Sequence, residues 1–463
     1  MAPIVAGVDS STQSVKVVLR DAESGELIAQ TSRPHPDGTE VDPRHWHQAL
    51  DSALKELTSH PIDAISIAGQ QHGMVALDAS GEVIRPALLW NDTRSSGEAE
   101  EINKEFPNIH QRTGSKLVAS FTASKVRWLS KNEPESAKKV AAIALPHDWL
   151  SWKLQGGNQI NNLFTDRSDA SGTGYFDSVN NQYCGDIFSF CLPNAEDIHL
   201  PKIVFPNELA GETTSGIPIA AGAGDNAGAA LGVGAKVGDL VISLGTSGTA
   251  FVVSSTPTHD LSGEVAGFAD ATGNYLPLAC TLNAAKIFAS TSAMLNLTFD
   301  QFSELALTAR SGADGLRLLP HFDGERTPNR PNSRGQLVGI NHSNFTRENI
   351  ARAAIEGVLA GMVYAATAVS KLGVNWNRVL LIGGAAKNSA VQQIAAKLFG
   401  GEVVIPAPGE YVADGAAKQA AWALTGAKEL PDWKDSKIET LTADYSEEDR
   451  EVVASYLNLI SKI

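Results

Sequence analysis

The chain has 463 residues, more than the roughly 250 to 300 that one hydrophobic core usually supports, so we expect two domains. Hydrophobic residues make up 43% and charged residues 19% of the chain, a composition that indicates a globular protein and gives no sign of intrinsic disorder. The 52 acidic residues outnumber the 37 basic ones and give a net charge of −15, which disfavours surfaces for nucleic acid or anionic membranes.

The sequence also predicts a cytoplasmic protein. Its three cysteines, Cys184, Cys191 and Cys280, form no CxxC pair and cannot all pair within one chain, which favours a reducing compartment. The first residues show no charged leader followed by an apolar segment, and no run approaches the about 18 apolar residues of a membrane span. A homodimer is compatible with this composition.

The N-terminus predicts a meander of three strands over residues 4–9, 15–21 and 27–34. The first connection, residues 9–14, reads Asp-Ser-Ser-Thr-Gln-Ser, which is more hydroxyl density than a hairpin needs. Such a turn offers N–H groups and hydroxyls to phosphate oxygens. Apolar residues at helical spacing then predict a helix over residues 45–57.

Polar residues follow two apolar segments in this half. The predicted strand 64–69 ends in residues 70–72, Gln-Gln-His, and such positions commonly line a ligand crevice in α/β proteins. A single His is as often a capped structural residue. The apolar run 87–90 similarly ends before Asn91 and Asp92, for which an N-cap of the next helix is a strong alternative.

The middle of the chain gives mixed signals. Residues 122–135 predict a helix that Pro134 ends or redirects. Residues 165–177, TDRSDASGTGYFD, alternate hydroxyls, acids and glycines without apolar periodicity, which predicts a loop. We place the domain boundary near residue 220. This gives an N-terminal domain over 1–220 and a C-terminal domain over 221–463, whose last helix is free to pack back on the first domain.

Residues 222–253 concentrate the predicted chemistry. Glycines flank Asp225 and a run of small residues follows it, so its carboxylate stands at a helix entrance. Residues 245–249, GTSGT, join two predicted strands and repeat the strand, hydroxyl-rich turn, strand plan of residues 4–21. We expect two related domains whose turns hold a nucleotide's phosphates from both sides. Taken alone, the GTSGT turn could be an ordinary glycine-rich hairpin, and the segment around Asp225 could be an ordinary helix cap.

The second half adds a loop, a long helix and a second glycine pair. Residues 322–335 form a loop with three arginines, for which a solvated connection is the alternative. Residues 348–372 predict a long amphipathic helix. A strand then passes through Gly383 and Gly384 into a further helix, and a base or ribose can lie flat against this glycine pair.

Several common motifs are missing from the sequence. It has no GxxxxGK[ST], and GAGDNAG misses the GxGxxG spacing of a dinucleotide fold. No HExxH and no paired CxxC occurs, which argues against a tightly held zinc. A magnesium ion that arrives with a nucleotide needs only one or two carboxylates, such as Asp9.

Seven segments, almost end to end and in order, resemble the FGGY carbohydrate kinases of the actin-like ATPase superfamily. They are GVDSSTQSVK (first phosphate loop), AGQQHGMVALD (sugar segment), SFTASKVRWLSKN, GAGDNAGAALG (catalytic aspartate), LGTSGT (second phosphate loop), GQLVGINHSNFTRENIARAAIE and GGAAKN (adenosine segment). The chain departs from the commoner D-x-G-T at Asp9-Ser10-Ser11-Thr12. At this departure, and around Gln71 and Asp225, the sequence resembles the branch of the family that acts on D-xylulose more than it resembles the glycerol kinases.

The resemblance implies an α/β fold of two actin-like (ribonuclease H-like) domains, each a mixed sheet flanked by helices, with a cleft between them. It implies phosphorylation of D-xylulose at its 5-hydroxyl by ATP with Mg²⁺; another neutral sugar such as ribulose, or a non-kinase actin-like ATPase, are the alternatives. The implied residues are Asp225 as base and Asp9 for magnesium; Gln71, His72, Trp90, Asn91, Asp225 and Asn226 for sugar; and Ser11, Thr12, Gln13, Gly245, Thr246, Ser247, Gly383, Gly384, Ala385 and Asn388 for nucleotide.

Overall fold

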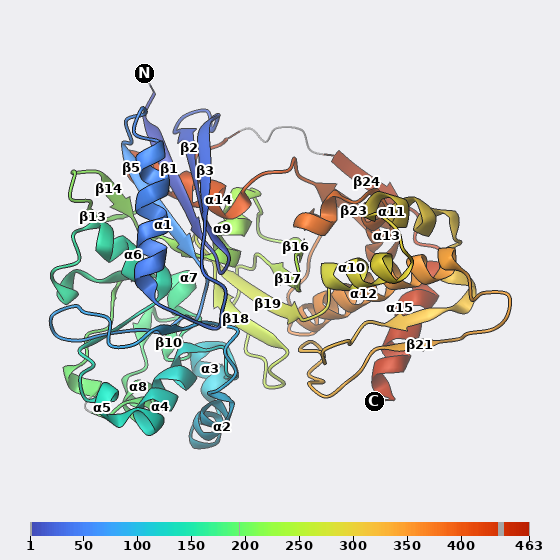
Figure 1. Cartoon of the computed structure of the whole chain (residues 1–463), viewed down its shortest axis with the longest axis horizontal. Helices are drawn as coiled ribbons and strands as arrows, with labels where there is room; N and C mark the ends of the chain where they lie inside the picture. The colour runs from blue at the N-terminus through green and yellow to red at the C-terminus, as the bar shows by residue number, and fades with distance from the viewer. Residues whose placement is uncertain (1, 194, 434–438, 463) are drawn as a thin grey trace.

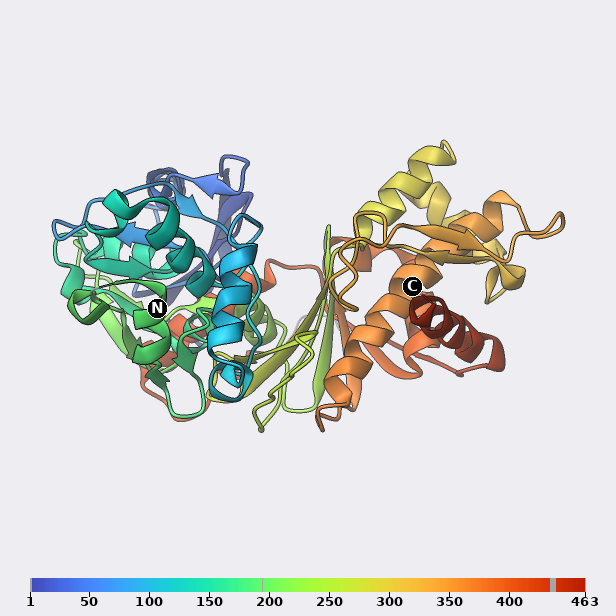
Figure 2. The ribbon, with the colours of Figure 1, turned by 90° about the horizontal axis from the view of Figure 1, so that it is seen from below.

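The structure is a computed structural model that describes residues 2–193, 195–433 and 439–462. It has two lobes, with the N-terminal half of the chain on the left in Figure 1 and most of the C-terminal half on the right. The view from below shows a sheet of the C-terminal half between the two lobes (Figure 2). The expected two-domain α/β fold is confirmed.

A mixed sheet forms the centre of the N-terminal lobe. In spatial order its strands are β13 (Leu209–Glu212), β14 (Pro218–Ala220), β5 (Ala64–Gly69), β1 (Ile4–Ser10), β2 (Ser14–Asp21) and β3 (Leu27–Pro34), and β15 (Ala223–Gly224) also pairs with β5. The predicted meander is confirmed, since β1, β2 and β3 pair antiparallel in sequence order. β1 pairs parallel with β5 on its other side.

The C-terminal sheet repeats this plan. In spatial order its strands are β18 (Val265–Ala269), β19 (Tyr275–Thr281), β17 (Gly248–Val252), β16 (Asp239–Leu244), β22 (Arg378–Ile382), β23 (Gly401–Ile405) and β24 (Glu439–Ala443). β16 pairs antiparallel with β17 and parallel with β22, as β1 does with β2 and β5. The two sheets therefore agree with the duplication expected from the sequence.

Helices cover the faces of both sheets. They are α1 (Pro43–Glu56), α2 (Ser96–Glu105), α3 (Ile109–Thr113), α4 (Thr122–Asn132), α5 (Pro134–Ala137), α6 (Pro146–Leu154), α7 (Arg167–Ala170), α8 (Gly185–Cys191), α9 (Asp225–Gly232), α10 (Ala285–Met294), α11 (Phe299–Thr308), α12 (Arg347–Ser370), α13 (Ser389–Phe399), α14 (Tyr411–Thr425) and α15 (Glu447–Ser461). α1 and α6 pack on one face of the N-terminal sheet, and α14 packs on the other. In the C-terminal lobe α12 packs on β17 and β19.

α9 and α14 cross at unusually short range. A Cβ added to Gly415 would lie 1.9 Å from the Gly228 carbonyl oxygen, and one added to Gly232 would lie 1.9 Å from that of Tyr411. Only glycine lets two helix backbones approach this closely. The small residues after Asp225 therefore serve close helix packing.

The domain boundary differs from the expected position near residue 220. β15 completes the N-terminal sheet beside β5, and α9 packs against α14, whereas the second sheet begins with β16. The strand pairing of residues 223 and 224 places the change of lobe after α9. The helix that returns to the N-terminal lobe is α14; the last helix, α15, packs on α12 and α13.

α12 satisfies a membrane-span criterion by length and composition, although the sequence predicted no span. It has 24 residues, and its most apolar window has a mean hydropathy of 1.5. However, 72% of that window is buried, and the helix packs against the sheet and against α10, α11, α13 and α15. These contacts are those of a core helix.

Candidate active site

Three neighbouring parallel strands end together and bring the predicted chemistry to one edge of the N-terminal sheet. Gly69, at the end of β5, pairs with Ser10 on one side and with Gly224 on the other. Asp9 therefore lies beside the chain that continues into Gln71, and Asp225 follows β15 directly. The carboxyl ends of parallel strands are where α/β proteins commonly bind ligands.

A cavity of about 260 Å³ opens at this edge. Its lining residues are Gln71, His72, Trp90, Ser120, Asp225, Asn226, Ser243, Gly245, Ser247, Thr249, Glu264, Ala266, Phe268, Leu278, Cys280 and Arg326. The structure thus gathers five of the six residues expected to bind sugar, together with three residues of the GTSGT turn. Both lobes contribute, so the cavity lies at their interface.

Asp225 is one of two partly buried carboxylates that line this cavity, the other being Glu264. Asn226 donates to Asp225 Oδ1 from the backbone N and from the side-chain Nδ2, each over 2.8 Å, and Asn226 Nδ2 lies 3.5 Å from Gln71 Oε1. Burial raises the pKa of the Asp225 carboxyl to about 6, although the hydrogen bonds from Asn226 oppose the rise. A carboxylate with a pKa near neutrality is suited to take a proton from a hydroxyl.

His72 presents a neutral imidazole to the same cavity. Its Nδ1 donates to the carbonyl oxygen of Gly172 over 2.6 Å, which leaves Nε2 as an acceptor. Burial lowers the pKa of His72 to about 3, so the ring is uncharged at pH 7. Its backbone has a φ of 69°, a left-handed conformation that is uncommon for a non-glycine residue and frequent at functional sites.

A second, larger cleft of about 850 Å³ adjoins the first. Its lining includes Asp9, Lys16, Ser243, Leu381, Ile382, Gly383, Gly384, Ala386, Lys387, Gln392 and the segment from Ile405 to Val412. Ser243 lines both cavities. A Cβ on Gly383 would lie 2.6 Å from the Leu244 carbonyl oxygen, and Gly383 has a φ of 95°, so only glycine fits there. A Cβ on Gly384 would meet open space, so this residue leaves a flat wall.

Asp9 is buried in the larger cleft, and its environment fits a cation. Its Oδ1 has no hydrogen-bond partner among the residues that the structure describes. Burial raises the pKa of the Asp9 carboxyl to about 7; the nearby Lys16 opposes this and the negative charge of Asp225 adds to it. A divalent cation would satisfy the unpaired oxygen and favour the ionised carboxylate.

Ser11, Thr12 and Gln13 of the first phosphate turn line neither cavity, whereas Asp9 at its start lines the larger cleft. Thr12 Oγ1 donates to Gln70 Oε1 over 3.2 Å and accepts from Trp90 Nε1 over 2.9 Å, so its hydroxyl is already engaged. Ser11 donates to the Ser14 carbonyl oxygen, and Gln13 is exposed. In the second turn Thr246 is exposed, while Gly245 and Ser247 line the smaller cavity.

Two residues expected near adenosine do not line the larger cleft. Ala385 is buried. Asn388 is the N-cap of α13, and its side-chain oxygen accepts from the backbone N–H groups of Ala390 and Val391. This hydrogen bonding is a structural role that the sequence motif did not separate from ligand binding.

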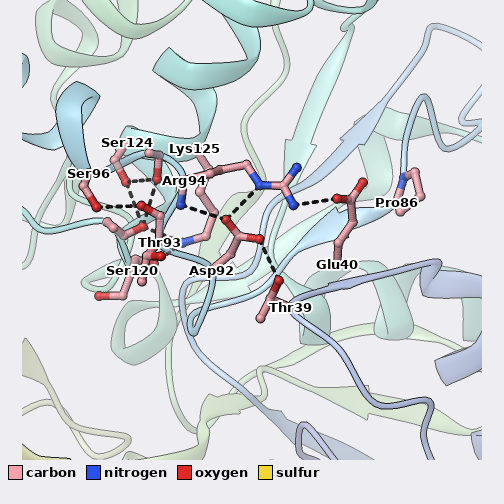
Figure 3. A network of polar contacts seen from close by, with 12 residues as sticks. Thr39, Glu40, Pro86, Asp92, Thr93, Arg94, Ser96, Ser120, Ser124 and Lys125 are labelled. Carbon is pink, nitrogen blue, oxygen red and sulfur yellow. Dashed lines mark hydrogen bonds and ion pairs between the residues drawn. The ribbon is translucent and has the colours of Figure 1, made fainter. Parts of the chain in front are cut away.

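Asn91 and Asp92 also lie outside the smaller cavity. The Asn91 side-chain oxygen is buried without a hydrogen-bond partner among the described residues. Asp92 accepts from Thr39 Oγ1 over 2.8 Å and from Arg94 Nε over 2.9 Å, and Arg94 also contacts Glu40 (Figure 3). Asp92 therefore anchors the segment after the strand. It does not cap α2, whose N-cap is Ser95.

Sequence reasoning missed Arg326, which reaches the smaller cavity from the loop 322–335. Its Nη1 lies 3.4 Å from Ser120 Oγ of the other lobe, and no ion pair forms between it and a described carboxylate. Ser120 itself is held by the buried Lys125, whose ammonium donates to the carbonyl oxygens of Ala119 and Ser120 (Figure 3). The three arginines in the loop 322–335 were the only sequence feature that could have pointed to Arg326 as a cavity residue.

Comparisons with known proteins agree with this arrangement. Residues 4–232 match a model described as the FGGY family of carbohydrate kinases, N-terminal domain, and residues 240–424 match the corresponding C-terminal domain. The interval between the two matches coincides with the change of lobe after α9.

Similar proteins span nearly the whole chain. The xylulose kinase of Streptomyces coelicolor is 43% identical over 442 residues, covering 92% of this chain and 89% of that protein. The xylulose kinase of Escherichia coli is 32% identical over 447 residues, covering 92% and 91%. The crystal structure of xylulose kinase from Bifidobacterium adolescentis matches with a TM-score of 0.92 and 43% identity, covering 98% of this chain and 99% of that chain.

Proposed function

The chain belongs to the FGGY family of carbohydrate kinases, and on that premise we propose that it transfers the γ-phosphoryl group of ATP to the 5-hydroxyl of D-xylulose. The observation that carries the proposal is the position of Asp225, a carboxylate of raised pKa in a small cavity that adjoins a larger cleft at Ser243. The relatives named xylulose kinase support the choice of sugar.

In this proposal Asp225 is the general base. The 5-hydroxyl oxygen forms a bond to the γ-phosphorus, the bond from that phosphorus to the leaving ADP oxygen breaks, and the hydroxyl proton passes to the Asp225 carboxylate. The two Asn226 hydrogen bonds to Oδ1 fix the carboxylate and keep it ionised at neutral pH. Phosphoryl transfer needs mainly such positioning and charge stabilisation.

Neutral side chains would bind the sugar. Gln71, His72 and Asn226 offer amide donors and acceptors and one imidazole acceptor to the cavity, and Trp90 offers a ring face. A polyol without charge is recognised by many directional hydrogen bonds. These side chains match that requirement.

The larger cleft would bind ATP. Gly383 and Gly384 give its base or ribose a flat surface, and the exposed turn at Gly245 and Thr246 offers N–H groups to phosphate oxygens. Asp9 would hold the magnesium ion that accompanies ATP, and the bound ion would neutralise phosphate charge. A phosphate contact by Thr12 would require its hydroxyl to leave Gln70 or Trp90.

We also propose that the enzyme acts in the cytoplasm, where ATP is abundant. Cys184, Cys191 and Cys280 are all free thiols, which is typical of a reducing compartment.

ADP release with a panel of sugars tests the proposed substrate. D-xylulose, D-ribulose, L-ribulose, glycerol and a reaction without sugar are compared at fixed Mg²⁺ and ATP. We expect the highest kcat/KM for D-xylulose and little ADP without sugar. A higher kcat/KM for a ribulose would assign the enzyme to that sugar, and equal ADP release without any sugar would indicate an ATPase that is not a kinase.

A further inference from the structure

A single buried turn, residues 166–172, supports the sugar cavity from behind. The carbonyl oxygen of Ser168 accepts from Gln71 Nε2 over 3.3 Å, and Ser168 Oγ accepts from the backbone N of Gly224 over 3.0 Å. The carbonyl oxygen of Gly172 accepts from His72 Nδ1 over 2.6 Å. The turn therefore contacts two sugar-cavity side chains and the residue immediately before Asp225. Its composition had predicted only a loop.

Asp166 organises this turn. It is the N-cap of α7, and its carboxylate accepts from the backbone N of Ser168 over 2.6 Å and of Asp169 over 3.0 Å. An N-cap carboxylate both satisfies free N–H groups and fixes the path of the chain into the helix. The position of Ser168 thus depends on the position of the Asp166 carboxylate.

His147, on α6, connects this carboxylate to the rest of the lobe. The ring is fully buried, with Nε2 3.2 Å from Asp166 Oδ1 and 3.4 Å from Asp169 Oδ2, and with Nδ1 3.3 Å from Asp148 Oδ1. Nε2 is hydrogen-bonded to Asp166, whereas Nδ1 lies at ion-pair distance from Asp148 without a hydrogen bond among the described residues. The ring also packs against the chain just before β15, since two of its atoms are 3.0 Å from where a Cβ of Gly222 would be.

The arrangement fits a protonated imidazole better than a metal ion. His147, Asp148 and Asp169 offer ligand atoms within 4.8 Å of one another, as a metal site would. However, Asp148 and Asp169 lie next to different ring nitrogens, whereas a metal ion binds one nitrogen of an imidazole. An imidazolium can donate from both nitrogens and pair with carboxylates on both sides.

The charges around the ring agree with this assignment. Burial alone would lower the pKa of His147, but Asp148, Asp166 and Asp169 outweigh it and raise the pKa to about 10. Burial raises the pKa of Asp169 well above its ordinary value, and the negative charge of Asp225 on α9 adds to that rise. Tyr175 and Tyr183, whose hydroxyl pKa values are raised by burial, also lie near these acids, and Arg167 directly follows Asp166.

We propose that His147 is a positioning residue of the sugar site. As a buried imidazolium it holds the Asp166 carboxylate, which caps α7, and the turn then holds Gln71, His72 and the chain entering Asp225. This role rests on the proposed sugar kinase function. It predicts that losing the imidazolium weakens sugar binding and leaves nucleotide binding intact, because His147 lies behind the smaller cavity and does not line the larger cleft.

The test compares His147→Gln with wild type, and with His199→Gln as a control for a partly buried histidine outside both cavities. Calorimetry measures the Kd of sugar and of ADP separately. We expect His147→Gln to weaken sugar binding about tenfold, the factor that a lost hydrogen bond to a charged group corresponds to, with an unchanged Kd for ADP. The control should change neither. Normal sugar affinity, or an equal loss of both affinities, would overturn the proposal.

A pH profile and one further variant separate positioning from general damage. His147→Gln should leave the acid limb of kcat/KM near pH 6, because burial and the Asn226 hydrogen bonds set the pKa of Asp225. Ser168→Ala removes only the hydroxyl that accepts from Gly224, so it tests the turn even if His147 variants fail to fold. Normal sugar binding by folded Ser168→Ala would contradict the proposal.

The sugar used in this experiment is whichever member of the panel wild type phosphorylates best. Failure of D-xylulose in the wild-type reaction would reject the proposed substrate only. A difference between wild type and the His147 and Ser168 variants, measured with the accepted sugar, decides the positioning role separately.

Discussion

Trp90 Nε1 donates to Thr12 Oγ1 over 2.9 Å, which joins a side chain of the smaller cavity to the first phosphate turn. Trp90 lines the cavity proposed for sugar, and Thr12 belongs to the turn proposed for phosphate. The hydroxyl of Thr12 also donates to Gln70, directly after β5. We therefore expect this hydrogen bond to link occupation of the smaller cavity to the conformation of the turn.

Trp90→Phe keeps an aromatic ring and removes this donor. We expect the KM values for sugar and for ATP both to change, by about 2- to 10-fold, the range for one net hydrogen bond. Trp433→Phe is the matched control, because the Trp433 indole donates to the Ala22 carbonyl oxygen and lines neither cavity. Steady-state kinetics with each substrate varied measures both effects. A change in the sugar KM alone would show that the two sites are not linked through Thr12.

Asp225→Asn should keep the fold and lose catalysis. Asn has nearly the same shape but cannot accept the hydroxyl proton, and loss of a positioned base typically lowers the rate about 100- to 10,000-fold. Binding of ADP should be unchanged, because Asp225 does not line the larger cleft. Asp186→Asn, on the surface, is the control. Turnover within a few-fold of wild type in a folded Asp225→Asn protein would reject Asp225 as the base.

The pH dependence of kcat/KM should show an acid limb near pH 6. Burial raises the pKa of Asp225 to about 6, so the base becomes protonated and inactive as the pH falls through that value. This loss of activity at low pH does not come from unfolding caused by Asp225, as the effect of its pKa on stability has the opposite sign. A carboxyl whose pKa is higher in the folded than in the unfolded chain contributes most to stability below its unfolded pKa of about 3.9, and that contribution is lost as pH rises through about 6. A kcat/KM that stays flat to pH 5 would contradict the assignment.

Asp9→Asn should change the magnesium dependence of the reaction. The substitution removes the negative charge of the buried carboxylate whose Oδ1 has no hydrogen-bond partner among the described residues. We expect the Mg²⁺ concentration for half-maximal activity to rise by about 10-fold or more, as measured by titration at fixed total ATP. The exposed Asp51→Asn serves as control. An unchanged magnesium requirement would separate Asp9 from the metal.

Arg326→Ala should weaken sugar binding and sugar-induced closure of the lobes. Arg326 reaches the cavity from the C-terminal lobe and lies 3.4 Å from Ser120 of the other lobe. A ligand between the lobes that contacts both favours a closed form. Small-angle scattering should show D-xylulose compacting wild type more than the variant, and Arg334→Ala, in the exposed part of the same loop, should behave as wild type. Equal compaction in all three proteins would assign Arg326 no role in closure.

The strand order of the N-terminal meander and most residues that line the smaller cavity could be predicted from the sequence. β1 to β3 follow from alternating apolar strands and short turns, and the polar residues after β5 and around Asp225 stand where strand ends meet. Parallel pairing of β5 with both β1 and β15 makes them neighbours. Residues at strand ends are predictable because the fold fixes where the chain emerges.

Features that depend on packing between distant segments were not predictable. β15 is only two residues long, so its pairing with β5, which moves the lobe boundary, leaves no periodic signal. Asn388 has the residue type expected for a ligand contact and is used as a helix cap instead. The contacts of Arg326 and His147 arise when separate elements meet, and a local sequence pattern does not encode such contacts.

Proton–phosphorus correlation NMR on the product of D-xylulose, ATP and Mg²⁺ tests the central claim most directly. We predict one sugar phosphate whose phosphorus correlates with the methylene protons of C5, which in turn couple to the proton of C4, formed in step with ADP. A correlation to the isolated methylene protons of C1, or ADP formed without any sugar phosphate, would contradict the proposed function.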